Sequence, residues 1–210
     1  MRLAPVKAAA LAVLFVLSFG TAAAKAESLV FTIFKEDDPI GRDVYSIDKN
    51  GDLTTVKVEM QTDVKLLFLD FHYRQDRTEV WRGDRLESLV SQTNDDGTKR
   101  YVELRRDGDS LVGTVDGTKK TLPGSIVPFT LWSPAFLKAS TLLDVSDTSQ
   151  MKIGVQDKGV DQLTVNGKSI AAHHYHLTGD LNWDFWYDAD GLLLKTTFRR
   201  SGYPIAFIRQ

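Results

Sequence analysis

The sequence predicts a mainly β protein: a single, strongly curved antiparallel sheet of meander type, forming a half-barrel or open barrel, with one short helix on its concave side. Three observations predict this fold. Turn signals recur along the chain, the runs between them alternate apolar and polar residues, and one segment alone carries helix-start signals.

Eight short stretches rich in Gly, Asn and Asp separate the β-like runs. Gly and Asn accept the positive φ that tight hairpin turns require, so such stretches between apolar runs predict hairpins. They cover residues 48–52, 94–97, 106–109, 116–117, 157–159, 166–167, 188–191 and 201–202. Because consecutive hairpins build a meander and no repeat or linker divides the chain, we expect one domain.

The clearest strand pattern lies in residues 55–68. Its apolar residues share one parity and its polar residues the other, which indicates a strand with one buried face. After Leu66 the apolar residues change parity, to Leu67, Leu69, Phe71 and Tyr73. We interpret this change as a bulge or bend near Leu67, or as a strand covered on both faces. A run of this length suits a sheet that wraps around something.

Residues 134–142 carry the helix signals. Ser133 is a typical N-cap and Pro134 suits the first helical position. We expect a short helix here, with Phe136, Leu137 and Trp132 directed toward the sheet.

The first 26 residues resemble a cleaved export signal. Arg2 and Lys7 precede an apolar run over residues 8–19, and Ala24-Lys25-Ala26 supplies a small-x-small ending. The run is shorter than the roughly 20 residues that a membrane-spanning helix needs, although an uncleaved anchor is the alternative. We therefore expect a signal peptide over residues 1–26, a single β domain over 27–210, a periplasmic location, and no transmembrane segment in the mature chain.

Composition excludes several functions. Removing the signal leaves 23 basic and 28 acidic residues, a formal net charge of −5, without a basic block that could bind nucleic acid. The chain has no cysteine. Disulfides, thiolate zinc sites and cysteine nucleophiles are thereby excluded, and the core alone must stabilise the fold.

Three of the four histidines lie in residues 171–177, "AAHHYHL". On a strand, His174 and His176 share one face, an arrangement that can bind a metal ion. A third ligand is required, and His72 or Asp70 would have to supply it. Because the pair alone lacks the ligand number that zinc needs, we interpret the stretch as a sheet strand and predict no metal site or cofactor.

Other chemistry-bearing motifs are weak. Residues 48–52 and 188–191 resemble fragments of calcium loops, and Glu59 stands twelfth from Asp48, but the intervening residues alternate as a strand does, so hairpin turns explain both. The chain has no serine or cysteine nucleophile motif. Pairs of carboxylates as in glycosidases stay open, since their separation needs a structure. We name no catalytic residue.

Aromatic residues suggest a concave apolar surface. In "WDFWYD", Trp183, Phe185 and Tyr187 share one face and Trp186 takes the other. Such residues most often fill a core, but they also line ligand cavities. The predicted lining residues are Phe68, Trp81, Trp132, Phe136, Trp183 and Trp186.

The chain also resembles a known family. "WYD-x-x-G" and a final "G-x-x-I-x-F" strand stand near the C-terminus, and weaker matches run through the N-terminal half. The matching residues are Gly41, Tyr45, Ile47, Gly51, Trp81, Gly83, Leu86, Thr93, Asp96, Gly97, Tyr175, Leu177, Gly179, Trp186, Tyr187, Asp188, Gly191, Gly202, Ile205 and Phe207. They resemble the exported proteins of domain of unknown function 6134 (DUF6134), a resemblance that implies no activity. More distantly, the strand plan resembles the curved half-barrels of the periplasmic lipoprotein carriers LolA and LolB, a likeness of fold.

Three functions follow as hypotheses. The sequence favours a periplasmic, non-enzymatic protein that binds an apolar small molecule or lipid on the concave face. The second hypothesis is a structural or partner-binding envelope protein whose concavity is filled by its own helix. The third is a metal-dependent enzyme that uses His174 and His176.

Overall fold

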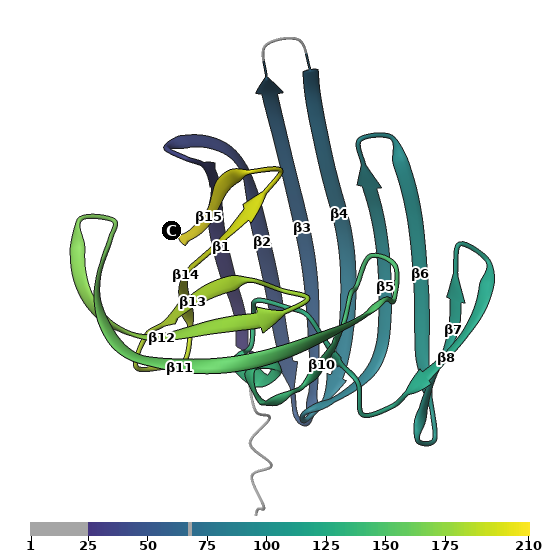
Figure 1. Ribbon diagram of the computed structural model, residues 1–210. Helices are drawn as coiled ribbons and strands as arrows, with labels where there is room; N and C mark the ends of the chain where they lie inside the picture. Colours follow the sequence, from purple (N-terminus) through teal and green to yellow (C-terminus); the bar gives the residue numbers. More distant parts are fainter. Residues whose placement is uncertain (1–24, 67–68) are drawn as a thin grey trace, which may run out of the picture.

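The computed structural model describes residues 25–66 and 69–210, and they form one open sheet of 15 strands curved around a central segment (Figure 1). The strands are β1 (Lys25–Lys35), β2 (Asp38–Asn50), β3 (Leu53–Leu66), β4 (Leu69–Arg82), β5 (Arg85–Asp95), β6 (Thr98–Asp107), β7 (Ser110–Val115), β8 (Thr118–Pro123), β9 (Val127–Pro128), β10 (Thr141–Leu143), β11 (Gln150–Val165), β12 (Lys168–Gly179), β13 (Trp183–Tyr187), β14 (Leu193–Arg200) and β15 (Tyr203–Arg209). The predicted signal peptide lies almost wholly outside the described residues and stays a prediction.

The sheet has two arms that meet at the N-terminal strand. β1 pairs with β2 on one side and with β15 on the other, so one arm runs from β2 to β8 and the other from β15 back to β9. All pairs are antiparallel except β9 with β10, and the sheet does not close, because β8 and β9 are its edges. The predicted fold class, a curved and mainly antiparallel open sheet, is confirmed.

Seven of the eight turn stretches join neighbouring strands, but residues 157–159 do not. They lie inside β11, where the register with β12 shifts between Asp157 and Gly159. Gly159 has a φ of +85°, and its N–H donates to Asp157 Oδ1 at 2.8 Å. The same residue types that favour a turn therefore form a β-bulge here.

The parity change after Leu66 is a chain reversal, and the interpretation as a bulge or bend near Leu67 is wrong. β3 ends at Leu66 and β4 begins at Leu69, with Leu66 paired to Leu69 and Val64 to Phe71. Paired residues lie on the same face of the sheet, and each pair here joins an even-numbered residue of β3 to an odd-numbered residue of β4. The inward-facing residues are therefore even-numbered on β3 and odd-numbered on β4. No Gly or Asn marks this hairpin.

The predicted helix is present but shorter than expected. η1 (Pro134–Lys138) is a single 3₁₀ segment, capped by the Ser133 hydroxyl, which accepts a hydrogen bond from the Ala135 N–H at 3.3 Å. Residues 141–143 belong instead to β10, where Leu142 and Leu143 are fully buried. Strand pairing with β9 and β11 ends the helix, because it satisfies this backbone and buries both leucines.

The core lies between the concave face of the sheet and the plug segment, defined as β9, η1 and β10 with the residues between them (127–143). Buried residues of β1, β2 and β3 alternate with half-buried or exposed ones, and in β3 this is the alternation that the sequence of residues 55–68 predicts. Phe136 of the plug segment packs against Phe129 and against Phe185 of β13. Among the described residues, no helix has the length and apolar character needed to span a membrane.

Candidate functional site

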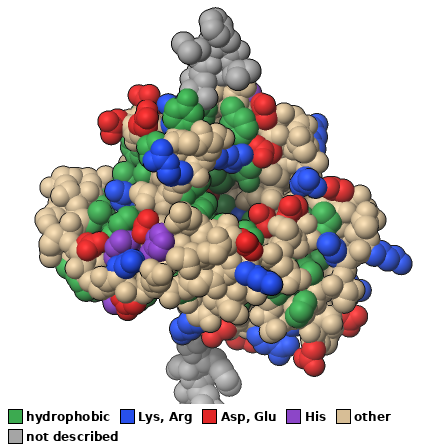
Figure 2. Space-filling view, viewed as in Figure 1, with side chains coloured by type: hydrophobic (Ala, Val, Ile, Leu, Met, Phe, Trp, Pro, Cys, Tyr) green, Lys and Arg blue, Asp and Glu red, His purple; other side chains and the backbone are tan. Residues whose placement is uncertain are grey.

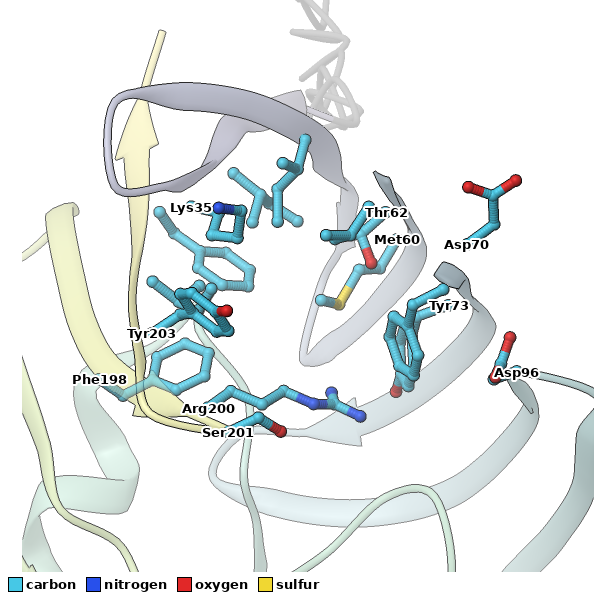
Figure 3. A pocket seen from close by; sticks show the side chains of 16 residues that line it. Lys35, Met60, Thr62, Asp70, Tyr73, Asp96, Phe198, Arg200, Ser201 and Tyr203 are labelled. Carbon is cyan, nitrogen blue, oxygen red and sulfur yellow. The ribbon is translucent and has the colours of Figure 1, made fainter. Parts of the chain in front are cut away.

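A cavity of about 370 Å³ opens at the end of the curved sheet where β1 ends and β4 begins. The inner faces of β1, β2, β3, β4, β14 and β15 supply its walls (Figure 3). Hydrophobic side chains are visible in a hollow at this end of the molecule, with basic side chains beside it (Figure 2).

The walls are largely apolar. Of the 16 lining residues, ten are aliphatic or aromatic: Ile33, Ile40, Met60, Val64, Phe71, Tyr73, Phe198, Tyr203, Ile205 and Phe207. They come from strands far apart in the sequence, which the β1–β15 pairing brings together. The cavity is therefore a product of the sheet's curvature rather than of one local motif.

Two basic residues, Lys35 and Arg200, line the same cavity. Lys35 Nζ lies 4.9 Å from the centre of the Tyr203 ring, and the Arg200 guanidinium lies 5.0 Å from the centre of the Phe71 ring. In Figure 3 the Arg200 side chain extends toward Tyr73. Cations over aromatic rings are held by the ring quadrupole, so both charges can remain beside apolar walls.

A ladder of polar side chains continues inward from the cavity along β4. Tyr73, Gln75, Arg77, Glu79 and Trp81 alternate with outward-facing residues, so they share the concave face. The Gln75 side-chain amide donates to the Tyr73 hydroxyl at 3.2 Å, and its carbonyl accepts from Arg77 Nη1. Hydrogen bonds thus connect a cavity wall to the buried interior.

Glu79 is the centre of this interior network. Its side chain is fully buried, and Arg77 Nε donates to its Oε1 at 2.7 Å. The indole N–H groups of Trp81 and Trp132 both donate to its Oε2, at 2.9 and 3.0 Å. Arg77 Nη2 also donates to Thr130 Oγ1 at 3.4 Å, so the network fastens the plug segment to β4.

Asp43, on β2, is a second buried carboxyl near Arg77. Burial raises its pKa to about 7, while the Arg77 charge and the hydrogen bond from the Tyr45 hydroxyl act in the opposite direction. Burial also raises the pKa of Tyr45 well above its usual range. Such a carboxyl exchanges its proton near neutral pH.

Comparison with known proteins adds the family. The family model described as "Domain of unknown function (DUF6134)" matches residues 31–210. The chain belongs to this family. A solved structure, a beta-barrel-like protein of domain of unknown function DUF1849 from Brucella abortus, superposes with a TM-score of 0.61 at 11% identity over 88% of this chain and 95% of that one. No curated protein matches the sequence. At this identity the likeness to the DUF1849 protein concerns the fold alone.

The cavity of this DUF6134 protein is not lined by those aromatic residues named from the sequence that the structure describes. Phe68 is outside the described residues, and none of the other five lines the cavity. Trp81 and Trp132 pack edge to face beside Glu79, with ring centres 5.7 Å apart. Trp183 stacks on Phe198, which does line the cavity, at 3.7 Å.

The other two predicted lining residues lie on opposite sides of the sheet. Phe136 is buried in the plug segment. Trp186 alternates with the inward residues Phe185 and Tyr187 of β13, so it takes the outer face, where it stacks on His174 with ring centres 4.4 Å apart.

The histidine pair shares one face, as strand parity predicts, but it meets an acid rather than a further histidine. His174 Nε2 and His176 Nδ1 lie 2.8 and 3.0 Å from the same atom, Asp184 Oδ1. His72 contacts Asp63 instead, on the β3–β4 hairpin. Figure 2 shows histidine and acidic side chains together on the surface over β11 and β12. Within residues 25–66 and 69–210, no group of three or more His, Cys, Asp or Glu side chains is arranged to hold a metal ion.

Sequence reasoning missed the cavity residues and the polar ladder. Residues 73–81 carry polar side chains on both parities, so the period-two pattern gives no inward face there. The inward face of β4 could have been found only from its pairing with β3. When Leu66 lies opposite Leu69, Arg77 lies opposite Val58 and Glu79 lies opposite Val56, so both share the buried face of β3.

Proposed function

We propose that this protein is exported to the periplasm and binds an apolar or lipid-like small molecule in the cavity at the open end of the sheet. One observation supports the proposal above all: a cavity of about 370 Å³ with mainly aliphatic and aromatic walls. Ligand sites in proteins typically have volumes of ~300–1,000 Å³ and apolar walls with a few polar groups.

The strands around the cavity indicate that the site is formed before a ligand binds. The walls are the inner faces of hydrogen-bonded strands. The Gln75 side-chain amide donates to the hydroxyl of the lining residue Tyr73, and also to Thr93 Oγ1 at 3.1 Å, so the Tyr73 side chain is fixed in position. Binding to such a site orders few groups, so less of the interaction energy is lost to conformational entropy.

The export part of the proposal rests on residues 1–26 and is tested separately. The full-length chain, expressed in its native type of cell and fractionated, is expected in the periplasm with Glu27 as its first residue by mass spectrometry. An intact N-terminus in the membrane fraction would contradict it.

Binding can be tested with delipidated protein and the neutral fluorophore N-phenyl-1-naphthylamine. Met60 lines the cavity, so Met60→Trp fills it and is expected to weaken binding about tenfold or more. Gln61→Trp is the matched control, because Gln61 is the next residue on β3 and is exposed. Val64→Phe, a smaller change in the same wall, should weaken binding in the same direction.

Circular dichroism spectra identify variants that fail to fold. The proposal is overturned if the wild-type protein gives no fluorescence enhancement, or if folded Met60→Trp and Gln61→Trp bind the fluorophore equally.

A further inference from the structure

Lys35 brings an ammonium group to the cavity. Its side chain is 13% exposed, and its ion-pair partner is the exposed Glu36, with Nζ and Oε2 3.7 Å apart. Among the described residues, no acceptor lies within hydrogen-bonding distance of Nζ. The N–H donors of this ammonium group therefore remain available for charge-assisted hydrogen bonds to an incoming anion.

Arg200 brings a second cation to the same opening. Its Nη2 lies 3.2 Å from both carboxylate oxygens of Asp95, whereas its Nε and Nη1 have no acceptor in the described part of the chain. Arg200 pairs with Tyr203 and Lys35 with Ile205, so the two cations flank β15 from opposite sides. Two strand spacings separate these backbones by about 10 Å, a gap that long side chains can narrow.

The acidic residues of the lining do not neutralise these cations. Asp70 is exposed and alternates with Phe71 on β4, so its side chain points to the outer face. Asp96 is an exposed turn residue with a φ of +49° between β5 and β6. Figure 3 shows both carboxylates at the outer edge of the lining. The charged side chains on the inner faces of the cavity are therefore the two cations, each of which has one acidic partner, Glu36 for Lys35 and Asp95 for Arg200.

We infer that the ligand is an anionic amphiphile, whose apolar tail lies along the walls and whose carboxylate or phosphate group lies between Lys35 and Arg200. This inference rests on the proposed function, since it names the class of molecule that the same cavity takes. Charge-assisted hydrogen bonds from Lys and Arg would fix the head group, and the aromatic and aliphatic residues would cover the tail.

The test uses probes with one chain length and different head groups, each below its micelle-forming concentration. Dodecanoate and dodecyl phosphate are the anions, dodecanol is the neutral probe and dodecyltrimethylammonium is the cation. We expect either anion to displace N-phenyl-1-naphthylamine with an affinity about tenfold or more above that of dodecanol, and the cation to bind most weakly. The stronger of the two anions identifies the head group as a carboxylate or a phosphate.

Charge-removing variants assign the effect to residues. Lys35→Met keeps the shape of the side chain and is expected to lose the preference for the anions while retaining dodecanol binding. Arg200→Gln should reduce the preference less, because its side chain is 47% exposed and already paired with Asp95. The matched control is Lys57→Met, at an exposed, outward position on β3.

The outcomes separate the two proposals. Equal affinity for the anions, dodecanol and the cation would overturn the inference and leave the proposed function standing. Binding of none of the four probes, and of no fluorophore, would overturn both. An anion preference that survives in Lys35→Met and in Arg200→Gln would also overturn the inference.

Discussion

Trp132 in the plug segment donates its indole N–H to Glu79 on β4, 53 residues earlier, at 3.0 Å. This hydrogen bond, with the one from Trp81 and the Arg77 ion pair, joins the plug segment to the sheet through one fully buried carboxylate. We therefore expect the contacts of Glu79 to contribute strongly to the stability of the fold.

Replacing Glu79 with Gln should destabilise the protein strongly. The charge on Arg77 would lose its closest partner in a buried environment, which typically costs about 3 kcal/mol. Urea unfolding followed by circular dichroism measures the loss. Glu59→Gln, at an exposed position on β3, is the control and should change stability by less than about 0.5 kcal/mol. Equal stability of the two variants would contradict the structural role of Glu79.

Asp43 should make stability depend on pH. Burial raises its pKa from 3.8 to about 7, so between these values the unfolded chain has lost a proton that the folded chain keeps. Stability from this group is therefore present below pH 4 and is lost as the pH rises toward 7. The Asp43→Asn variant lacks this dependence. The difference between its free energy of unfolding and that of wild type should therefore shift by about 4 kcal/mol in favour of the variant between pH 4 and pH 8.

The measurement is a series of urea titrations across that pH range. Asp84→Asn, at an exposed position in the β4–β5 turn, should reproduce the wild-type profile. Parallel curves for wild type and Asp43→Asn would show that folding does not raise the pKa of Asp43.

Phe136 separates core packing from ligand binding. It is 1% exposed and packs against Phe129 and Phe185, with ring centres 5.4 and 5.2 Å away. Phe136→Ala should cost about 3–5 kcal/mol, while the exposed neighbour variant Lys138→Ala costs little. Because Phe136 does not line the cavity, folded Phe136→Ala should bind N-phenyl-1-naphthylamine as wild type does. Loss of binding in a folded variant would instead support Phe136 as a lining residue.

The histidine pair should prove structural. His174 and His176 both contact Asp184 Oδ1, and the three side chains are partly exposed. His174→Ala and His176→Ala should each change stability by less than about 1 kcal/mol. Elemental analysis should find the same metal content in both variants as in wild type. A zinc ion bound in wild type and lost from either variant would revive the hypothesis of a metal enzyme.

Local sequence chemistry was sufficient to predict much of the fold. Gly and Asn residues marked seven chain reversals, and alternation marked the buried face of β3. Ser133 and Pro134 located the start of η1 correctly. These features depend on neighbouring residues alone, so one sequence is enough to find them.

Features that depend on how the strands pair, and not on residue type alone, were not predicted. The hairpin between Leu66 and Leu69 has apolar residues where a turn signal would stand, and Asp157 with Gly159 forms a bulge from turn-like residues. The residues that line this cavity were not named as such from the sequence, for the same reason. Its residues stand at the ends of six strands, and only the curvature and register of the whole sheet bring them together.

The pairing of β1 with β15 has a further consequence for how the chain reaches its native state. β1 ends at Lys35 and β15 begins at Tyr203, so joining them closes a loop of nearly the whole domain. Long loops of this kind carry a high entropic cost and slow folding. Until β15 forms, one edge of β1 has unpaired N–H and C=O groups that invite pairing with other chains. During folding, this edge of β1 therefore stays open to aggregation until the last strand of the chain, β15, has formed.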